Sequence, residues 1–142
     1  MSYFYTRFRE KFRVIFYLIL SMRILFVCVG NSCRSQMAEA IARNMGHVAC
    51  SAGTHPADKV SENAIITLEN RGISSEGLTP KSVDNFSAED FDWVISMGCG
   101  VSCPMMEIDE DWGLEDPVGM PLEVFEKTAD EIEQRLKLLL EA

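Results

Sequence analysis

After Met22 the chain alternates between short apolar runs and segments with helical periodicity. Residues 24–29 (ILFVCV) form a continuous apolar run, which is typical of a strand buried on both faces. Beyond this run, Met37, Ile41 and Met45 recur every four residues, as the buried stripe of a helix does. The pattern therefore predicts a strand, a turn and a helix in this order.

Further strands and helices follow in the same alternation. Residues 48–52 and 92–97 are predicted strands, and Gly72 ends a helical stretch with an apolar face formed by Val60, Ala64, Ile65 and Leu68. A charged final helix carries an apolar stripe made of Leu122, Phe125, Ala129, Ile132, Leu136 and Leu139. Strands that alternate with helices pair in parallel through right-handed crossovers. We therefore predict an α/β fold, a single domain with an open twisted parallel sheet of about four strands flanked by helices.

Residues 1–21 do not fit this alternation. Their basic start and the apolar run 14–20 imitate a signal peptide, but the run is short and no small-residue cleavage site follows. The run is also shorter than the roughly 20 apolar residues of a membrane-spanning helix. We expect residues 1–21 to be an extension outside the domain, added by an upstream start codon, and residues 22–142 to form the domain. Attachment of the extension to a membrane surface is the alternative.

Composition and charge limit the class of partner. The 142 residues, 47% of them hydrophobic, suffice for one core. Residues 1–21 hold four of the 13 basic residues and one of the 22 acidic residues, so the remainder carries a formal charge of −12. Such a surface repels nucleic acids and anionic lipids, so neither is an expected partner. An anionic ligand would need a local, preorganised site.

The five cysteines do not resemble the disulfide framework of a small secreted protein. Their odd number and the size of the core favour reduced thiols and a cytoplasmic location. We expect Cys50, inside the apolar sequence VACSA, to pack as a small hydrophobic residue. Cys28, Cys33, Cys99 and Cys103 require a separate interpretation.

The turn after the first predicted strand combines the residues of an anion site. Gly30 and Asn31 tolerate positive φ and allow successive N–H groups to face inward, next to the guanidinium of Arg34. A thiol at Cys28 would meet the helix dipole, Arg34 and the hydroxyl of Ser35, all of which favour a thiolate. The turn thus predicts a nucleophile below an oxyanion-binding loop formed by Val29, Gly30, Asn31, Ser32, Cys33 and Arg34.

This loop carries a family resemblance. The sequence CVGNSCRSQMAE, residues 28–39, resembles the active-site loop of the low-molecular-weight protein tyrosine phosphatase superfamily. Its continuation QMAE, residues 36–39, resembles the thioredoxin-coupled arsenate reductase branch of that superfamily. The similarity extends from Met22 nearly to Ala142 and includes SAGT at 51–54 and WGLEDP at 112–117. Residues 1–21 have no counterpart in it.

The resemblance also implies roles outside the loop. Asp116, followed by Pro117, corresponds to the general acid of the family. Phosphatases of the family usually carry aromatic residues just after this pair, whereas this chain has Val118 and Gly119. Lys81 stands where some members bear an acid that helps to hold a monovalent cation, and its ammonium is expected to replace that cation. We interpret the Cys33 side chain as structural and pointing away from the anion.

Cys99 and Cys103 follow the third predicted strand, at the same edge of the sheet as Cys28. Glycines flank Cys99, and three residues separate the two cysteines, a spacing that allows their sulfurs to meet. The alternatives are that the two cysteines supply half of the ligands of a zinc site, or that they are two packed thiols. His47 and His55 do not have the spacing of metal ligands. We therefore expect no metal site and no bound cofactor.

The resemblance implies a reaction that uses these thiols. Cys28 attacks arsenate, Asp116 protonates the departing oxygen, and Cys99 attacks Cys28 with release of arsenite. Cys103 then attacks Cys99, and thioredoxin reduces the final disulfide. A phosphatase that hydrolyses phosphomonoesters through a phosphocysteine is the alternative, and a thiol-based sensor without turnover is a third hypothesis.

Overall fold

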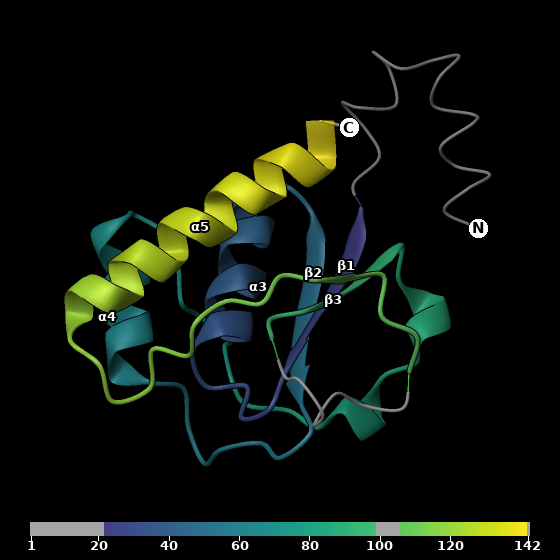
Figure 1. Ribbon diagram of the computed structural model, residues 1–142, viewed down its shortest axis with the longest axis horizontal. Helices are drawn as coiled ribbons and strands as arrows, with labels where there is room; N and C mark the ends of the chain where they lie inside the picture. The colour runs from purple at the N-terminus through teal and green to yellow at the C-terminus, as the bar shows by residue number, and fades with distance from the viewer. Residues whose placement is uncertain (1–21, 99–105, 142) are drawn as a thin grey trace.

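The computed structural model describes residues 22–98 and 106–141 of the chain. Within these residues, parallel strands form one sheet in the order β2-β1-β3-β4 (Figure 1). The strands are β1 (Arg23–Cys28), β2 (Val48–Gly53), β3 (Trp93–Ser96) and β4 (Glu110–Asp111). The helices are α3 (Arg34–Asn44), α4 (Glu62–Asn70), α5 (Leu122–Glu141) and the 3₁₀ helices η1 (Val83–Asn85) and η2 (Ala88–Asp90). The predicted α/β fold with a parallel sheet of about four strands is confirmed.

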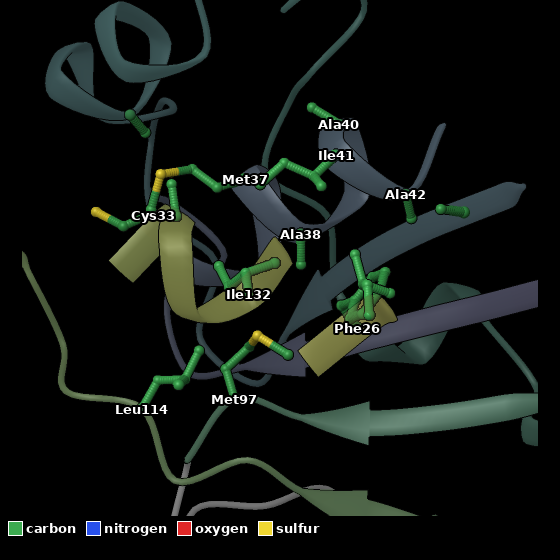
Figure 2. Close-up of a cluster of buried hydrophobic side chains, with 14 of the residues drawn as sticks. Phe26, Cys33, Met37, Ala38, Ala40, Ile41, Ala42, Met97, Leu114 and Ile132 are labelled. Carbon is green, nitrogen blue, oxygen red and sulfur yellow. The ribbon is translucent and has the colours of Figure 1, made fainter. Parts of the chain in front are cut away.

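Strand β1 pairs with β2 and β3 along its two edges, and a buried side-chain cluster covers each of its two faces. Ile24 and Phe26 belong to a buried cluster that α3, α4 and α5 complete, and Figure 2 shows part of this cluster around Met37 and Ile132. The alternate residues of β1, such as Val27, join a second cluster with side chains from η1 and the following segment. The apolar run at 24–29 therefore reflects burial on both faces, as predicted.

Helix α5 runs across α3 and α4 on one side of the sheet (Figure 1). Its stripe of apolar side chains is fully buried at Ile132 and Leu136 and nearly so at Phe125. None of the helices in the described part of the chain is long and apolar enough to cross a membrane. The proposed extension, residues 1–21, lies outside the described residues.

The strand register brings the ends of three strands to one edge. Cys28, the last residue of β1, is opposite Gly53 of β2, and Val27 is opposite Ser96 of β3. Because all these strands are parallel, the turns that follow them meet at their carboxyl ends. The candidate loop is therefore at the edge where open α/β sheets bind ligands.

Two details differ from the sequence-based expectation. Val60 lies before α4, which begins at Glu62, although its side chain is buried as the periodicity predicted. The periodicity also gave no sign of β4, because this strand consists of two exposed acidic residues, Glu110 and Asp111. Its pairing with β3 is a tertiary contact that no apolar pattern encodes.

Candidate active site

The loop between β1 and α3 contains one residue with a left-handed backbone. Asn31 has φ of 52°, and it is the only non-glycine residue with positive φ in the described part of the chain. Gly30, which was also expected to supply such a conformation, does not have positive φ. The reversal of the chain at this point therefore depends on Asn31, a residue type that tolerates the left-handed region.

The carbonyl groups of residues 28–32 are all engaged by hydrogen bonds. Four of them accept main-chain N–H groups from residues 54–61, which we call the strap: Thr54 N–H to Cys28 O at 3.1 Å, His55 N–H to Val29 O at 2.8 Å, Ala57 N–H to Gly30 O at 2.8 Å and Ser61 N–H to Ser32 O at 2.9 Å. The fifth, Asn31 O, accepts from Nε2 of Gln36 at 2.9 Å. Because these carbonyls face the strap and α3, the loop can present its N–H groups on the opposite, concave side.

Cys28 lies at the base of this concave loop and is nearly buried, with 3% of its surface exposed. Its sulfur is 2.8 Å from Oγ of Ser35 and accepts the N–H of Asn31 at 3.1 Å. The contact with Ser35 is the one that the sequence predicted. Two hydrogen-bond partners at the sulfur would stabilise a negative charge there.

A chain of buried side chains fixes the direction of these hydrogen bonds. Ser51 donates to Oε1 of Glu39 at 2.6 Å, and Nδ2 of Asn31 donates to Oγ of Ser51 at 2.9 Å and to Oγ of Ser35 at 2.7 Å. Ser35 thus accepts a hydrogen bond from Asn31, and its own hydroxyl hydrogen is free to point at the Cys28 sulfur. Glu39, a carboxylate that only accepts when ionised, fixes the Ser51 hydroxyl as a donor, and Nδ2 of Asn31, which can only donate, fixes the other two hydrogen bonds.

Two cations compensate the buried carboxylate of Glu39. Nη2 of Arg43 is 2.5 Å from Oε2 of Glu39, and Nζ of Lys81 is 3.5 Å from Oε1. The main chain of Lys81 also holds the loop, because its N–H donates to Oδ1 of Asn31 at 2.8 Å. The Lys81 ammonium therefore lies beside Glu39, whereas its expected replacement of a monovalent cation stays a prediction.

Arg34 connects the loop with two other segments. It is 6% exposed, and its Nη1 donates to the carbonyls of Leu114 at 3.0 Å, Met97 at 3.2 Å and Gly98 at 3.5 Å. Its Nη2 is 3.7 Å from Oδ2 of Asp116. These contacts leave donors on Nε and Nη2 for an anion, so only part of the guanidinium fork expected from the sequence is available.

Asp116 reaches the site from the segment after β4. Its Oδ1 accepts the N–H of Val118 at 3.1 Å, a local turn that holds the carboxylate, and its side chain is 54% exposed. Pro117 is buried, whereas Val118 is 58% exposed. The structure thus brings the predicted acid next to Arg34, and no aromatic wall follows it.

The remaining cysteines divide into three cases. Cys33 is 2% exposed and packs in the cluster with Met37 and Ile132 (Figure 2), and burial raises the pKa of its thiol. Burial also raises the pKa of Cys50, a half-buried residue of the second cluster. Both observations agree with a packing role. Cys99 and Cys103 lie outside the described residues, so their predicted roles stay predictions.

Sequence reasoning assigned no role to several polar residues that build the site. Gln36, Glu39 and Ser51 are fully buried and hold the loop or the hydrogen-bond chain. They belong to the stretches 36–39 and 51–54, which carried the family resemblance. The available signal was polar residues in otherwise apolar, buried elements, since α3 exposes almost none of its residues before Arg43.

A parallel α/β domain with a cysteine at the base of an amide-lined loop defines the class of cysteine-dependent phosphatase-like proteins. The chain belongs to the family described as "Low molecular weight phosphotyrosine protein phosphatase", which it matches over residues 23–142.

Relatives with curated names are similar over most of the chain. The "Glutaredoxin arsenate reductase" of Synechocystis sp. is 42% identical over 125 residues, which cover 83% of this chain and 95% of the relative. The "Arsenate reductase" of Staphylococcus aureus is 35% identical over 119 residues, which cover 77% of this chain and 88% of the relative.

Solved structures share the fold. "An arsenate reductase in the phosphate binding state" superposes with a TM-score of 0.77 at 41% identity, covering 84% of this chain and 97% of that chain. A low molecular weight protein tyrosine phosphatase from T. tengcongensis gives a TM-score of 0.68 at 36% identity, covering 85% and 99%. Both reductases and phosphatases therefore share this architecture.

Proposed function

We propose that this protein reduces arsenate to arsenite, with Cys28 as the nucleophile. The observation that carries the proposal is the Cys28 sulfur, which lies at the base of a loop whose carbonyls are all turned outward. Support also comes from the similarity to proteins named arsenate reductases. The expected location of the reaction is the cytoplasm, where thiols stay reduced.

Arsenate would bind as a tetrahedral anion in the loop. The N–H groups of residues 29–34 would donate to its oxygens, except that of Asn31, which donates to the Cys28 sulfur, and Arg34 would add its Nε and Nη2 donors. The local charge of these groups must overcome the acidic surface, which repels anions at longer range. A preorganised loop achieves this because its dipoles need no rearrangement when the anion arrives.

The first chemical step would join sulfur to arsenic. The Cys28 thiolate attacks arsenic(V), an As–O bond breaks, and the departing oxygen leaves as water after taking a proton from Asp116. Ser35 and the N–H of Asn31, which contact the sulfur, would hold the thiolate in place before the attack. Asp116 is the acid that the family resemblance assigns to this step, and its Oδ2 lies 3.7 Å from Nη2 of Arg34, which would also contact the anion.

The second step would transfer two electrons to arsenic. The Cys99 thiolate attacks the Cys28 sulfur, a Cys28–Cys99 disulfide forms, and the electron pair of the broken S–As bond stays on arsenic, which leaves as arsenite. Cys103 then attacks Cys99, which forms a Cys99–Cys103 disulfide and returns Cys28 as a thiolate. The two electrons thus come from a pair of thiols, and the scheme uses no bound cofactor.

An external dithiol would close the cycle by reducing the Cys99–Cys103 disulfide. Thioredoxin is the reductant that the sequence resemblance implies, whereas the name of the Synechocystis relative points to glutaredoxin. The two can be separated by supplying each complete reducing system in turn and following NADPH oxidation that depends on arsenate. The system that supports the higher kcat/KM identifies the reductant.

Phosphomonoester hydrolysis is the second candidate function. Cys28, Arg34 and Asp116 are the groups that a phosphocysteine mechanism would need, and Asp116 lies beside Arg34. An exposed valine after Pro117, in place of an aromatic wall, disfavours phosphotyrosine as the substrate. We expect at most weak hydrolysis of an aryl phosphate.

A single-turnover experiment tests the relay. Treated once with arsenate, Cys103→Ser should release one arsenite and accumulate the Cys28–Cys99 disulfide, whereas the wild type should accumulate Cys99–Cys103. Cys99→Ser should release little arsenite. Peptide mapping under non-reducing conditions identifies each disulfide.

Two results would count against this scheme. The same disulfide in the wild type and in Cys103→Ser would exclude the order of the relay. No arsenite from any variant, together with intact hydrolysis of an aryl phosphate, would favour the phosphatase function.

A further inference from the structure

Gln36 is a fully buried polar residue with only half of its amide satisfied. Its Nε2 donates to the carbonyl of Asn31 at 2.9 Å. Its Oε1 is buried and has no donor within hydrogen-bond distance in the part of the chain that the structure describes. The Nε2 donor of Gln36 therefore has a hydrogen-bond partner, whereas the buried Oε1 acceptor has none among the described residues.

The carbonyl that Gln36 holds is distinct within the loop. Of the five carbonyls of residues 28–32, those of residues 28, 29, 30 and 32 accept main-chain N–H groups of the strap, which every residue type except proline supplies. Asn31 O alone accepts from a side chain. Its orientation therefore depends on the identity of residue 36.

Asn31 is also the residue whose backbone most needs to be held. It has a left-handed φ of 52°, and its own N–H donates to the Cys28 sulfur at 3.1 Å. The peptide group between Asn31 and Ser32 carries the held carbonyl on one side and the N–H of Ser32 on the other. If the carbonyl turned inward, it would place a partial negative charge where an anion binds and would remove one amide donor.

The unpaired Oε1 is an energetic cost that an apolar side chain would avoid. A buried acceptor without a donor destabilises a protein, whereas an apolar residue of similar volume at position 36 would carry no such cost. The interaction that favours glutamine at position 36 is therefore the hydrogen bond that Nε2 donates to the Asn31 carbonyl.

We infer that Gln36 is a positioning residue that holds the Asn31–Ser32 peptide with its N–H toward the anion and keeps the Asn31 N–H on the Cys28 sulfur. This inference rests on the proposed function of the loop as an oxyanion site. Gln36 touches neither the anion nor the sulfur and acts through Asn31.

The first test compares Gln36→Met with Thr67→Val. Methionine keeps the volume and removes the donor. Thr67 is a matched control because it is fully buried in α4 and its Oγ1 also has no partner among the described residues. Calorimetry with inorganic phosphate should show about fivefold to fiftyfold weaker binding for Gln36→Met and unchanged binding for Thr67→Val, the size expected for one lost hydrogen bond to a charge-binding group.

A stability measurement separates positioning from a structural role. Gln36→Met should leave the urea midpoint close to that of the wild type, because it removes one buried acceptor without a donor, Oε1 of Gln36, leaves another, the Asn31 carbonyl, and retains the packing volume. Weaker phosphate binding in a protein of similar stability is the signature of positioning. Equal phosphate binding by the wild type and Gln36→Met would overturn the inference.

A second variant remains informative if Gln36→Met fails to fold. In Gln36→Glu, the protonated carboxyl can donate to Asn31 O, but the carboxylate cannot. Its phosphate affinity relative to the wild type should therefore fall as the pH rises, with near-wild-type binding at the acidic end. A ratio that does not change with pH would contradict the inference.

The reactivity of Cys28 provides a readout that does not involve anion binding. In a Cys33→Ala, Cys50→Ala background, with Cys99 and Cys103 replaced by serine, the pH profile of alkylation reports the Cys28 thiolate. Gln36→Met should shift this profile to higher pH, because the Asn31 N–H is less firmly held on the sulfur. Failure of the wild type to bind phosphate would count against the proposed function, whereas an unshifted alkylation profile would count against the role of Gln36 alone.

Discussion

At the residue scale, Arg34 combines two tasks that a lysine cannot. Its Nη1 donates to the carbonyls of Met97, Gly98 and Leu114, while its Nη2 lies 3.7 Å from Asp116 Oδ2 and its Nε is left for an anion. A lysine ammonium is a single point with three donors, so it can serve the carbonyls or an anion but not both in a planar arrangement. A lysine at position 34 would keep the positive charge but would not reproduce the planar arrangement of donors.

We therefore predict that Arg34→Lys lowers kcat/KM for arsenate by about 100-fold or more, because a small misplacement of the anion costs roughly this much. Steady-state assays coupled to the reductant measure the change. Arg135→Lys, at an exposed position of α5, is the matched control and should keep full activity. Near-normal turnover of Arg34→Lys would show that the guanidinium does not orient the substrate.

Gly53 illustrates a steric requirement at the same site. A Cβ at Gly53 would lie 2.5 Å from the carbonyl oxygen of Val29 and 3.0 Å from Cβ of Asn31, so any side chain would push the loop outward. The requirement arises because β2 ends directly against the loop, where Gly53 is opposite Cys28.

Gly53→Ala is thus expected to lower the free energy of unfolding by about 1–3 kcal/mol and to weaken phosphate binding. Gly30→Ala, in the loop itself, provides the comparison for stability, because its Cβ would meet nothing closer than Oγ of Ser32 at 3.7 Å. Urea denaturation measures both variants. The prediction fails if the two alanine variants have the same unfolding midpoint.

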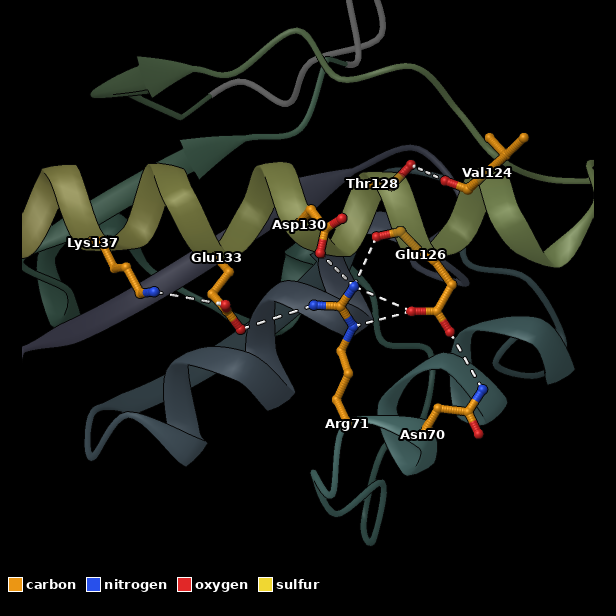
Figure 3. A network of polar contacts seen from close by, with 8 residues as sticks. All are labelled: Asn70, Arg71, Val124, Glu126, Thr128, Asp130, Glu133 and Lys137. Atoms are coloured by element: carbon orange, nitrogen blue, oxygen red, sulfur yellow. Dashed lines mark hydrogen bonds and ion pairs between the residues drawn. The ribbon is translucent and has the colours of Figure 1, made fainter.

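At the element scale, Arg71 joins the end of α4 to α5 (Figure 3). Its Nη2 donates to Asp130 Oδ1 at 2.6 Å, to Glu126 O at 2.9 Å and to Glu126 Oε1 at 3.2 Å. Although burial lowers the pKa of Arg71, hydrogen bonds with Asp130 and Glu126 raise it above its ordinary value overall. The contact with a main-chain carbonyl distinguishes this network from a simple surface ion pair.

Replacement of Arg71 by Gln should therefore lower the free energy of unfolding by about 1–2 kcal/mol, since a partly buried network exceeds the contribution of an exposed pair. Lys137→Gln is the control, because Lys137 pairs with Glu133 at 3.8 Å and is 62% exposed. Its expected effect is about 0.5 kcal/mol or less. Thermal unfolding compares the two, and equal losses would show that Arg71 acts as an ordinary surface charge.

His47 joins β1 and β2 at the opposite end of the sheet from the candidate site. Its Nδ1 accepts the N–H of Met22 at 3.1 Å, so this nitrogen must be unprotonated, and burial lowers the pKa of the imidazole. A pKa that is lower in the folded state means that protonation favours unfolding. The contribution of His47 is fully present above the unfolded-state pKa of about 6.5 and is lost as the pH falls below it.

We predict that the wild type loses stability on acidification below about pH 6.5 more steeply than His47→Gln does. Glutamine can still accept the Met22 N–H but does not titrate. Urea midpoints at several pH values measure the slopes, with His55→Gln, at an exposed position, as the control. Parallel slopes for the wild type and His47→Gln would exclude this linkage.

At the scale of the whole molecule, the sheet and the candidate residues all lie beyond residue 21. β1 begins at Arg23, and the first residue with a proposed chemical role is Cys28. We predict that a chain that starts at Met22 folds with an unchanged unfolding midpoint and reduces arsenate at the rate of the full chain. Circular dichroism and the coupled assay test this, and a truncated chain that does not fold would show that residues 1–21 belong to the core.

Most of the architecture could be predicted because buried positions in a strand or a helix form regular apolar patterns along the sequence. The run at 24–29 and the stripe of α5 show the patterns of a buried strand and a helix, and the predicted strands at 24–29, 48–52 and 92–97 agree with β1, β2 and β3 within about two residues. β4 could not be predicted, because its two residues are exposed and acidic and form no apolar pattern. Cys28, Ser35 and Arg34 were also predictable, since the spacing within one turn fixes which of them can meet.

The sequence by itself thus determined the order of the main strands and helices, the sheet edge that carries the candidate loop and the choice of Cys28 as the candidate nucleophile, because these follow from local periodicity and short spacings. Only the tertiary structure decided how the loop is held. The strap and the chain from Glu39 through Ser51 to Asn31 join segments that are distant in sequence. Hydrogen bonds between distant segments depend on the folded positions of both partners, and no period or spacing along the chain specifies them.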